Sequence, residues 1–167
     1  WNPRQKYLRK IYLKNDTLRY FRAEENESAL IPVGSNAFAM AGVGEGLTVT
    51  FEGAGPNRKM SVTAEDASPT LLDVVEITEA TEVERASQVG TYYSKEVETA
   101  YRISEEECEM QVYHPRHGSI PLQRLFRDVY SAEGPAGILE IQRNPEGAVT
   151  GILISNGRVR NAWFEKQ

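Results

Sequence analysis

Two histidines, His114 and His117, stand close together in the segment "YHPRHGS" and are the only histidines of the chain. Two imidazoles at this spacing could bind one metal ion, but a zinc site needs three or four protein ligands. No third ligand is evident from the sequence, and Pro115 and Gly118 are residues that favour turns. We therefore expect a polar hairpin loop without a metal or other cofactor, and a metal site at His114 and His117 is the alternative.

Serine chemistry would need a hydroxyl activated by a neighbouring base, and a lysine three residues after the serine is one known arrangement. No serine in this chain is followed by lysine at that spacing. We therefore expect this chain to carry no catalytic residue.

Other polar residues could serve contacts rather than catalysis. The loop residues Arg116, His117 and Gly118 are candidates for a surface that meets a neighbouring domain. Arg124, Arg127 and Asp128 could also face outward and dock a partner through charge-assisted hydrogen bonds. We favour the other interpretation, an ordinary polar strand face.

The bulk composition excludes two classes of function. The 167 residues carry a formal charge of -5, and lysine and arginine are scattered, so we expect no nucleic-acid partner. No apolar run approaches the roughly 20 residues that span a bilayer, so we expect no membrane insertion. The single cysteine, Cys108, cannot form an internal disulfide, and its alternating context predicts a small side chain in the core.

The elements that must position these residues are short strands. Apolar residues alternate with polar ones in runs broken by turn residues, which indicates antiparallel hairpins. In "TAYRISEEECEMQVYH", Tyr101 and Ile103 alternate with polar neighbours, and the glutamate run forms the turn. Asn156-Gly157 predicts a two-residue type I′ turn in a later hairpin. Asn144 to Gly147 predicts another turn.

One helix is predicted. In "EATEVERASQV", Thr81 and Glu84 have the spacing of a capping box. Val83, Ala86 and Val89 would share one side of this short helix.

The two halves of the chain follow one pattern. At an offset of 92 residues Ile11 falls on Ile103, and at an offset of 89 Met60 falls on Val149. We therefore predict two domains, residues 1–77 and 78–167, with the helix at the start of the second. The matching helix of the first domain would precede Trp1, so we expect the first domain to be cut within its first strand.

Aromatic side chains supply bulk for the second domain. They could line a cavity for a small apolar ligand or fill the core themselves, and a barrel of about eight strands is only just wide enough for its own side chains. We expect core filling. The residues concerned are Tyr92, Tyr93, Tyr101, Tyr113, Tyr130 and Trp163.

This order of elements has a known parallel. A helix, Gly-Thr-Tyr-Tyr at 90–93, an acidic hairpin, Ile-Pro-Leu at 120–122, "FRDVY" and the closing "GAVTGILISNGRVRNAWFEK" resemble the C-terminal accessory domains of serine beta-lactamase-like and penicillin-binding-protein-like hydrolases. The resemblance covers residues 80–167 and extends to 1–77 through the repeat. It implies an all-β fold of two tandem antiparallel lipocalin-like up-and-down β-barrels, with about eight strands each.

The departures from that family shape the functional prediction. Its catalytic domain carries Ser-x-x-Lys, Tyr-x-Asn or Ser-x-Asn, and Lys-Thr-Gly, and none is present here. The resemblance therefore implies a non-catalytic accessory part whose partner is an N-terminal serine hydrolase domain of the same polypeptide. Such a part would shape access to the active site or form a dimer contact, in the periplasm or outside the cell. The alternative is a free-standing carrier of a small apolar ligand.

Overall fold

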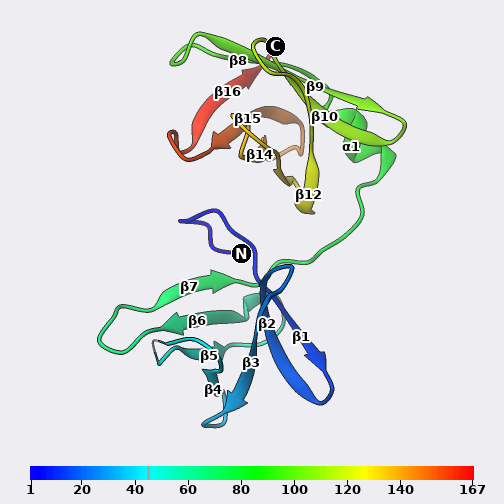
Figure 1. The fold of residues 1–167 in the computed structure, drawn as a ribbon. Coiled ribbons are helices and arrows are strands. Elements are labelled where there is room, and N and C mark those ends of the chain that lie inside the picture. Colours follow the sequence, from blue (N-terminus) through cyan, green and yellow to red (C-terminus); the bar gives the residue numbers. More distant parts are fainter. Residues whose placement is uncertain (45) are drawn as a thin grey trace. The chain divides into compact units, whose positions relative to one another are not determined.

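The chain forms two compact units with one antiparallel sheet each (Figure 1). The computed structural model describes residues 1–44 and 46–167. The units are Trp1–Val75 and Glu76–Gln167. Among the described residues, no helix has the length and apolar character needed to cross a membrane.

The first unit is a seven-stranded up-and-down sheet, in which each strand pairs with its neighbour in sequence. It curls into a half-barrel around a core of Tyr20, Leu30, Met40, Val49, Met60 and Leu72. The strands are β1 (Lys10–Lys14), β2 (Thr17–Ala23), β3 (Asn26–Pro32), β4 (Ala37–Met40), β5 (Thr48–Glu52), β6 (Lys59–Thr63) and β7 (Thr70–Asp73), with a short 3-10 helix η1 (Gly55–Asn57) before β6.

The second unit is a nine-stranded antiparallel sheet in the order β11-β10-β9-β8-β16-β15-β14-β13-β12. Its first strand, β8, pairs with both β9 and the last strand β16, which curls the sheet into a nearly closed barrel. Its elements are α1 (Glu82–Gln88), β8 (Gly90–Ser94), β9 (Thr99–Glu106), β10 (Glu109–His114), β11 (Gly118–Pro121), β12 (Gln123–Phe126), β13 (Val129–Ser131), β14 (Ile138–Arg143), β15 (Val149–Ser155) and β16 (Ala162–Lys166).

This architecture confirms the predicted fold class. Both sheets are antiparallel and connected by hairpins, and one helix precedes the second barrel. The two edge strands of the second sheet, β11 and β12, are separated in the chain by Leu122 alone. The first sheet remains a half-barrel, since no strand of this unit pairs with both β1 and β7 within the described residues.

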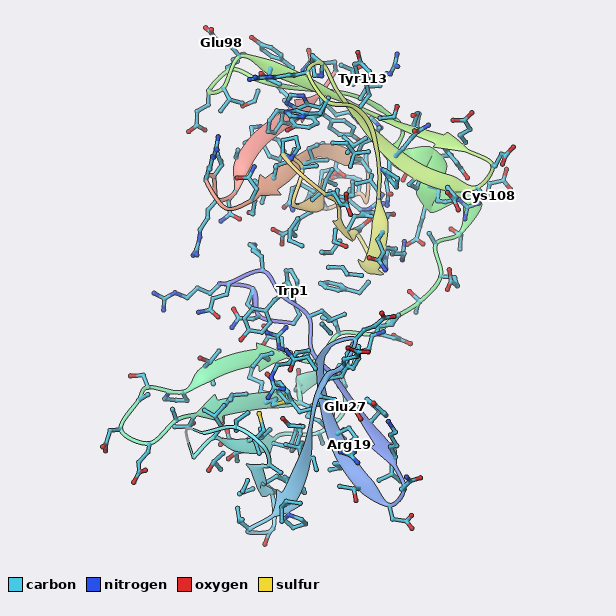
Figure 2. All side chains as sticks on the ribbon, viewed as in Figure 1. Trp1, Arg19, Glu27, Glu98, Cys108 and Tyr113 are labelled. Atoms are coloured by element: carbon cyan, nitrogen blue, oxygen red, sulfur yellow. The ribbon has the colours of Figure 1, made fainter. Side chains whose placement is uncertain are left out.

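The β9–β10 hairpin turns at Glu107 and Cys108, not at the earlier glutamates. Both residues have positive φ, 51° and 68°, as a two-residue type I′ turn requires. Cys108 is therefore exposed, and Figure 2 shows it near the tip of this hairpin. The prediction that Cys108 lies in the core is wrong. It assumed that apolar and polar residues alternate up to Cys108, whereas Cys108 belongs to the turn.

The predicted Asn156-Gly157 turn is also wrong. β15 ends at Ser155 and β16 begins at Ala162, so a longer loop joins them. The Asn156 side chain accepts hydrogen bonds from the backbone N–H groups of Arg158 and Val159, both at 2.9 Å. Asparagine here organises a wider loop through its side chain instead of adopting positive φ. The turn at Asn144 to Gly147, by contrast, is confirmed by the 2.9 Å bond between its ends.

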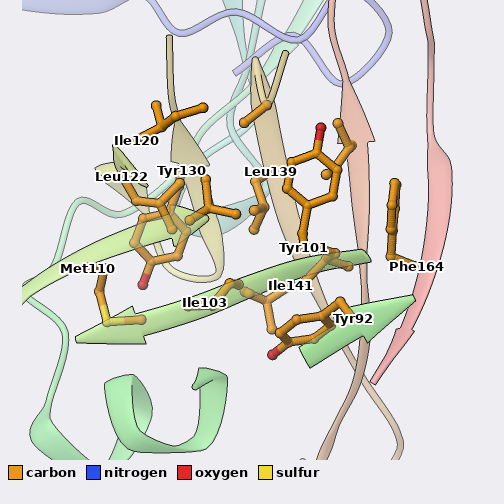
Figure 3. Packing of buried hydrophobic residues seen from close by; sticks show 14 of the residues in the cluster. Tyr92, Tyr101, Ile103, Met110, Ile120, Leu122, Tyr130, Leu139, Ile141 and Phe164 are labelled. Carbon is orange, nitrogen blue, oxygen red and sulfur yellow. The ribbon is translucent and has the colours of Figure 1, made fainter. Parts of the chain in front are cut away.

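The aromatic residues of the second unit divide between the two faces of the sheet. Tyr92, Tyr101 and Tyr130 are buried in the core, as Figure 3 shows. The expectation that their companions also fill the interior is wrong, because those side chains stand on the outer face. The outward-facing residues, between 36% and 40% exposed, are Tyr93, Tyr113 and Trp163.

The position of Trp163 has a local cause. A Cβ atom added to Gly151 on the neighbouring strand would lie 2.2 Å from the Trp163 ring. The indole therefore rests on the outer face at a place that glycine leaves free. This close approach explains why a buried glycine interrupts the apolar strand β15.

The first hairpins of the two units have equivalent registers. Lys10 pairs with Phe21 in the first unit, and Arg102 pairs with Tyr113 in the second. Each residue of the pair in the second unit lies 92 positions after its counterpart in the first.

The last hairpins follow the same offset. Met60 pairs with Leu72, and Ile152 pairs with Phe164, again 92 residues later. The predicted offset of 89, which would align Met60 with Val149, is wrong for this hairpin. Side chains alternate between faces along a strand, so an alignment three residues away from the observed one would exchange inward and outward positions.

Candidate functional site

The His114–His117 loop connects β10 and β11. The two imidazole rings lie 4.7 Å apart between centroids, and the His114 ring meets Tyr101 edge-on at 5.1 Å. His114 Nδ1 accepts a hydrogen bond from the backbone N–H of Arg116 at 3.0 Å. Gly118 has a φ of +74°, which suits the end of this turn.

The electrostatics of this loop favour a neutral His114. Burial lowers the pKa of His114 below its ordinary value, and the neighbouring His117 and Arg116 lower it further. Among residues 1–44 and 46–167, no group of three His, Cys, Asp or Glu side chains is arranged to hold a metal ion. The imidazole of His114 instead acts as a hydrogen-bond acceptor that holds the turn.

The helix α1 packs against the second unit through its polar side. The Thr81 hydroxyl accepts from the Glu84 N–H, and the Glu84 carboxylate accepts from the Thr81 N–H, which confirms the predicted capping box. Val83, Ala86 and Val89, which were predicted to share one side of the helix, are all exposed. The buried helix residue is Gln88.

Gln88 links the helix to the barrel core. Its side-chain Oε1 accepts from the Tyr130 hydroxyl at 2.6 Å, and its backbone carbonyl accepts from the Tyr92 hydroxyl at 2.5 Å. Both tyrosine hydroxyls lie on the side of the core nearest the helix in Figure 3. Burial raises the pKa of Tyr92 and of Tyr130, so both remain protonated donors at neutral pH.

A charged cluster lies next to Gln88. Gln88 Nε2 donates to Asp128 at 3.1 Å, and Arg143 makes two bonds of 2.9 Å to the same carboxylate. The Lys166 ammonium donates to the Ser87 carbonyl at 2.6 Å, at the C-terminal turn of the helix. Through this network, polar groups of the helix form hydrogen bonds with residues that are distant in sequence. The sequence analysis missed it, because no local pattern indicates partners separated by 40 or more residues.

Arg124 and Arg127 differ in their surroundings. The Arg127 side chain is 69% exposed and lies 3.2 Å from Glu84. The Arg124 side chain is only 14% exposed, and its Nη2 lies 3.7 Å from the same carboxylate. The outward docking role considered for Arg124 therefore does not fit its burial. Its side chain lies instead near the acidic residue of helix α1.

Arg124 also lines an open pocket of about 720 Å³ beside the bend between β11 and β12. Its guanidinium nitrogens are buried there and find no hydrogen-bond acceptor among the described residues. Met110 and Leu122 contribute apolar surface, and Glu79, Glu109 and Glu133 contribute carboxylates.

Comparison with models of protein families finds no match for this chain, and comparison with curated proteins finds none either. Functional inference therefore depends on the residues themselves. These residues supply a filled barrel, a helix with an exposed apolar side and a mixed-charge pocket.

Proposed function

We propose that this chain is the non-catalytic accessory part of a serine hydrolase of the beta-lactamase and penicillin-binding-protein type. It would adjoin the catalytic domain of the same polypeptide, in the periplasm or outside the cell, and limit which substrates reach the active site. The ordered series of segments from the helix to the closing hairpin motivates the choice of this family.

The observation that carries the proposal is the filled interior of the second unit. Tyr92 is 0% exposed, Tyr130 is 2% exposed and Phe164 is 3% exposed, and all belong to one continuous cluster. Tyr101 meets Phe164 edge-on within it, with 5.0 Å between ring centroids. A barrel packed in this way supplies a rigid surface rather than a reaction chamber.

The outer side of α1 supports a contact with another domain. Val83 is 79% exposed and Val89 is 38% exposed, and Ala86 lies between them on the helix. These side chains leave apolar surface open on a helix whose position is fixed by a polar network, and a partner could cover it. We propose that this apolar surface contacts the hydrolase domain, and that the Arg116–Gly118 loop lies at the opening of the active site of that domain.

The same barrel pattern accounts for both units. We infer that they are tandem copies, which is supported by the shared offset of 92 residues in the first and last hairpins. The Asn15–Asp16 turn of the first unit has positive φ at both residues, as Glu107 and Cys108 have in the second. These turns also lie 92 residues apart.

The alternative, a carrier of a small apolar ligand, has less support. Its ligand would need an open apolar interior, whereas the second barrel is occupied by its own aromatic side chains. The pocket beside Arg124 is lined by charged groups as well as apolar ones, which suits an apolar ligand poorly.

Surface variants in the full-length polypeptide test the accessory role. We expect Val83→Lys and Arg116→Glu to change the ratio of kcat/KM between a bulky and a small hydrolase substrate by about fivefold or more. Such a factor corresponds to about 1 kcal/mol of contact energy. Steady-state kinetics with both substrates would measure it, and circular dichroism would verify that the fold is unchanged.

Matched controls lie in the β8–β9 turn of the same unit. Val97→Lys repeats the apolar-to-lysine change at a residue that is 41% exposed, and Lys95→Glu repeats the charge reversal. Both controls should leave the substrate ratio unchanged. Equal ratios in all four variants would argue against the proposed role.

A further inference from the structure

The open pocket beside the bend between β11 and β12 has an apolar floor. Met110, Leu122 and Tyr130 line it from β10, from the bend and from β13. Figure 3 shows these three side chains on the same side of the core. Pro121, which is exposed, extends the floor toward solvent. The volume of about 720 Å³ lies in the range of pockets that hold small organic ligands, and the floor can cover the hydrocarbon part of one.

The two arginines that line this pocket each have an acidic partner. Arg85 Nε donates to Glu105 at 2.6 Å, and Arg124 Nη2 lies 3.7 Å from Glu84. Both partner carboxylates lie outside the pocket lining. The guanidinium nitrogens of Arg124 are also closed off from solvent, so a molecule in the pocket does not reach them. The arginines therefore bring little positive charge to a bound ligand.

Three other carboxylates of the pocket differ from these. We call them the rim carboxylates, and they belong to Glu79, Glu109 and Glu133. Glu79 precedes the helix, Glu109 lies in β10 and Glu133 follows β13. All three residues are exposed, and within residues 1–44 and 46–167 none of them forms an ion pair with lysine or arginine. The rim of the pocket therefore carries negative charge that the protein itself does not neutralise.

The negative charge continues along the β9–β10 hairpin. A hollow of about 270 Å³ shares Glu109 and Pro121 with the pocket and is also lined by Glu106 and Glu107. Glu106 and Glu109 are direct partners in the hairpin register. Like charges in this position destabilise a strand pair, so a cation bound beside them would relieve a repulsion.

The carboxylates suit an extended cation better than a single ion. Among the residues that the structure describes, no three His, Cys, Asp or Glu side chains are arranged to hold a metal ion. The rim carboxylates come instead from three separate segments around one apolar floor. A ligand complementary to this arrangement has several positive charges that are separated by methylene groups.

We propose that this pocket binds a linear aliphatic polyamine. Its ammonium groups pair with Glu79, Glu109 and Glu133 through charge-assisted hydrogen bonds, and its methylene groups lie on the apolar floor. The binding is non-covalent. The site is independent of the accessory role proposed above, because it needs only residues of the second unit.

Titration of the full 167-residue chain with spermidine tests this site. Isothermal titration calorimetry at low salt should show one spermidine bound per chain. Amide NMR shifts should concentrate at Met110, Leu122 and Ala132, which line the pocket. Glu109→Gln combined with Glu133→Gln should weaken binding at least about fivefold, because two of the three rim carboxylates are lost.

The matched control combines Glu96→Gln with Glu146→Gln, which removes the same charge at two exposed turns outside the pocket. It should bind spermidine as tightly as the original chain. All four changes affect exposed side chains, so circular dichroism should show an unchanged fold. Butylamine, which has a single ammonium group, should bind at least about tenfold more weakly than spermidine.

Three results would overturn the polyamine site. The first is the absence of saturable binding up to about 10 mM spermidine. The second is equal affinity in the rim variant and the matched control. The third is that magnesium chloride produces the same amide shifts, or that spermidine shifts amides evenly over the acidic surface, since either would indicate unspecific charge attraction.

Discussion

Tyr92→Ala is expected to destabilise the second unit by about 3–5 kcal/mol. The side chain is fully buried between β9 and β16, and its removal leaves a cavity that rigid strands on both sides cannot close. Unfolding in denaturant, followed by the fluorescence of Trp163 in a Trp1→Phe background, measures this loss, because Trp1 and Trp163 are the only tryptophans.

Tyr92→Phe is the matched control. It keeps the ring and removes only the hydroxyl that donates to the Gln88 carbonyl, so we expect a loss of about 0.5–1.5 kcal/mol. A loss below about 1 kcal/mol for Tyr92→Ala would mean that the ring does not fill the barrel. That result would restore the ligand-carrier alternative.

Gln88→Leu is expected to destabilise the second unit by about 1–3 kcal/mol, although it keeps the size of the side chain. The Tyr130 hydroxyl would lose its acceptor inside the core, and Asp128 would lose one donor. The helix itself should remain formed, since its capping box does not involve Gln88. Denaturant unfolding combined with helix-region amide exchange would separate these effects.

A double-mutant cycle identifies the cause. Tyr130→Phe removes the hydroxyl that Gln88→Leu leaves without an acceptor. The double variant should therefore be more stable than the sum of the single losses predicts, by about 1 kcal/mol. Strict additivity would show that Gln88 and Tyr130 do not stabilise each other, and that the helix is held by the charged cluster alone.

The all-β fold could be predicted because alternation is a local signal. Tyr101, Ile103 and Val112 alternate with polar neighbours and are buried in the β9–β10 hairpin. The capping box at Thr81 and Glu84 likewise depends on residues three apart. Both predictions are confirmed by the structure, since the forces involved act within one element.

Features that depend on tertiary partners could not be predicted. The capping box indicates the helix, but nothing local indicates that Gln88 is its buried residue, bonded to Tyr130 and Asp128 from distant strands. The burial of Arg124 next to Glu84 likewise depends on how the helix lies against the sheet. Charge and amide partners of this kind outweigh a weak apolar stripe, and sequence periodicity does not identify them.

Two other predictions failed at turns, for a different reason. Cys108 adopts positive φ in a two-residue turn, although asparagine and glycine are the usual residues there. Asn156, which has the expected residue type, supports a longer loop through its side chain. The register of the flanking strands decided both turns, because it fixed how many residues had to connect them.

Covalent labelling of the full-length polypeptide most directly tests the central proposal that this chain adjoins a serine hydrolase and carries no reactive centre. The protein is treated with a fluorescent penicillin and with a fluorophosphonate, and the labelled residue is located by mass spectrometry. We predict a single labelled serine outside residues 1–167, followed three residues later by lysine. A label on any residue within 1–167, or no labelled serine at all, would contradict it.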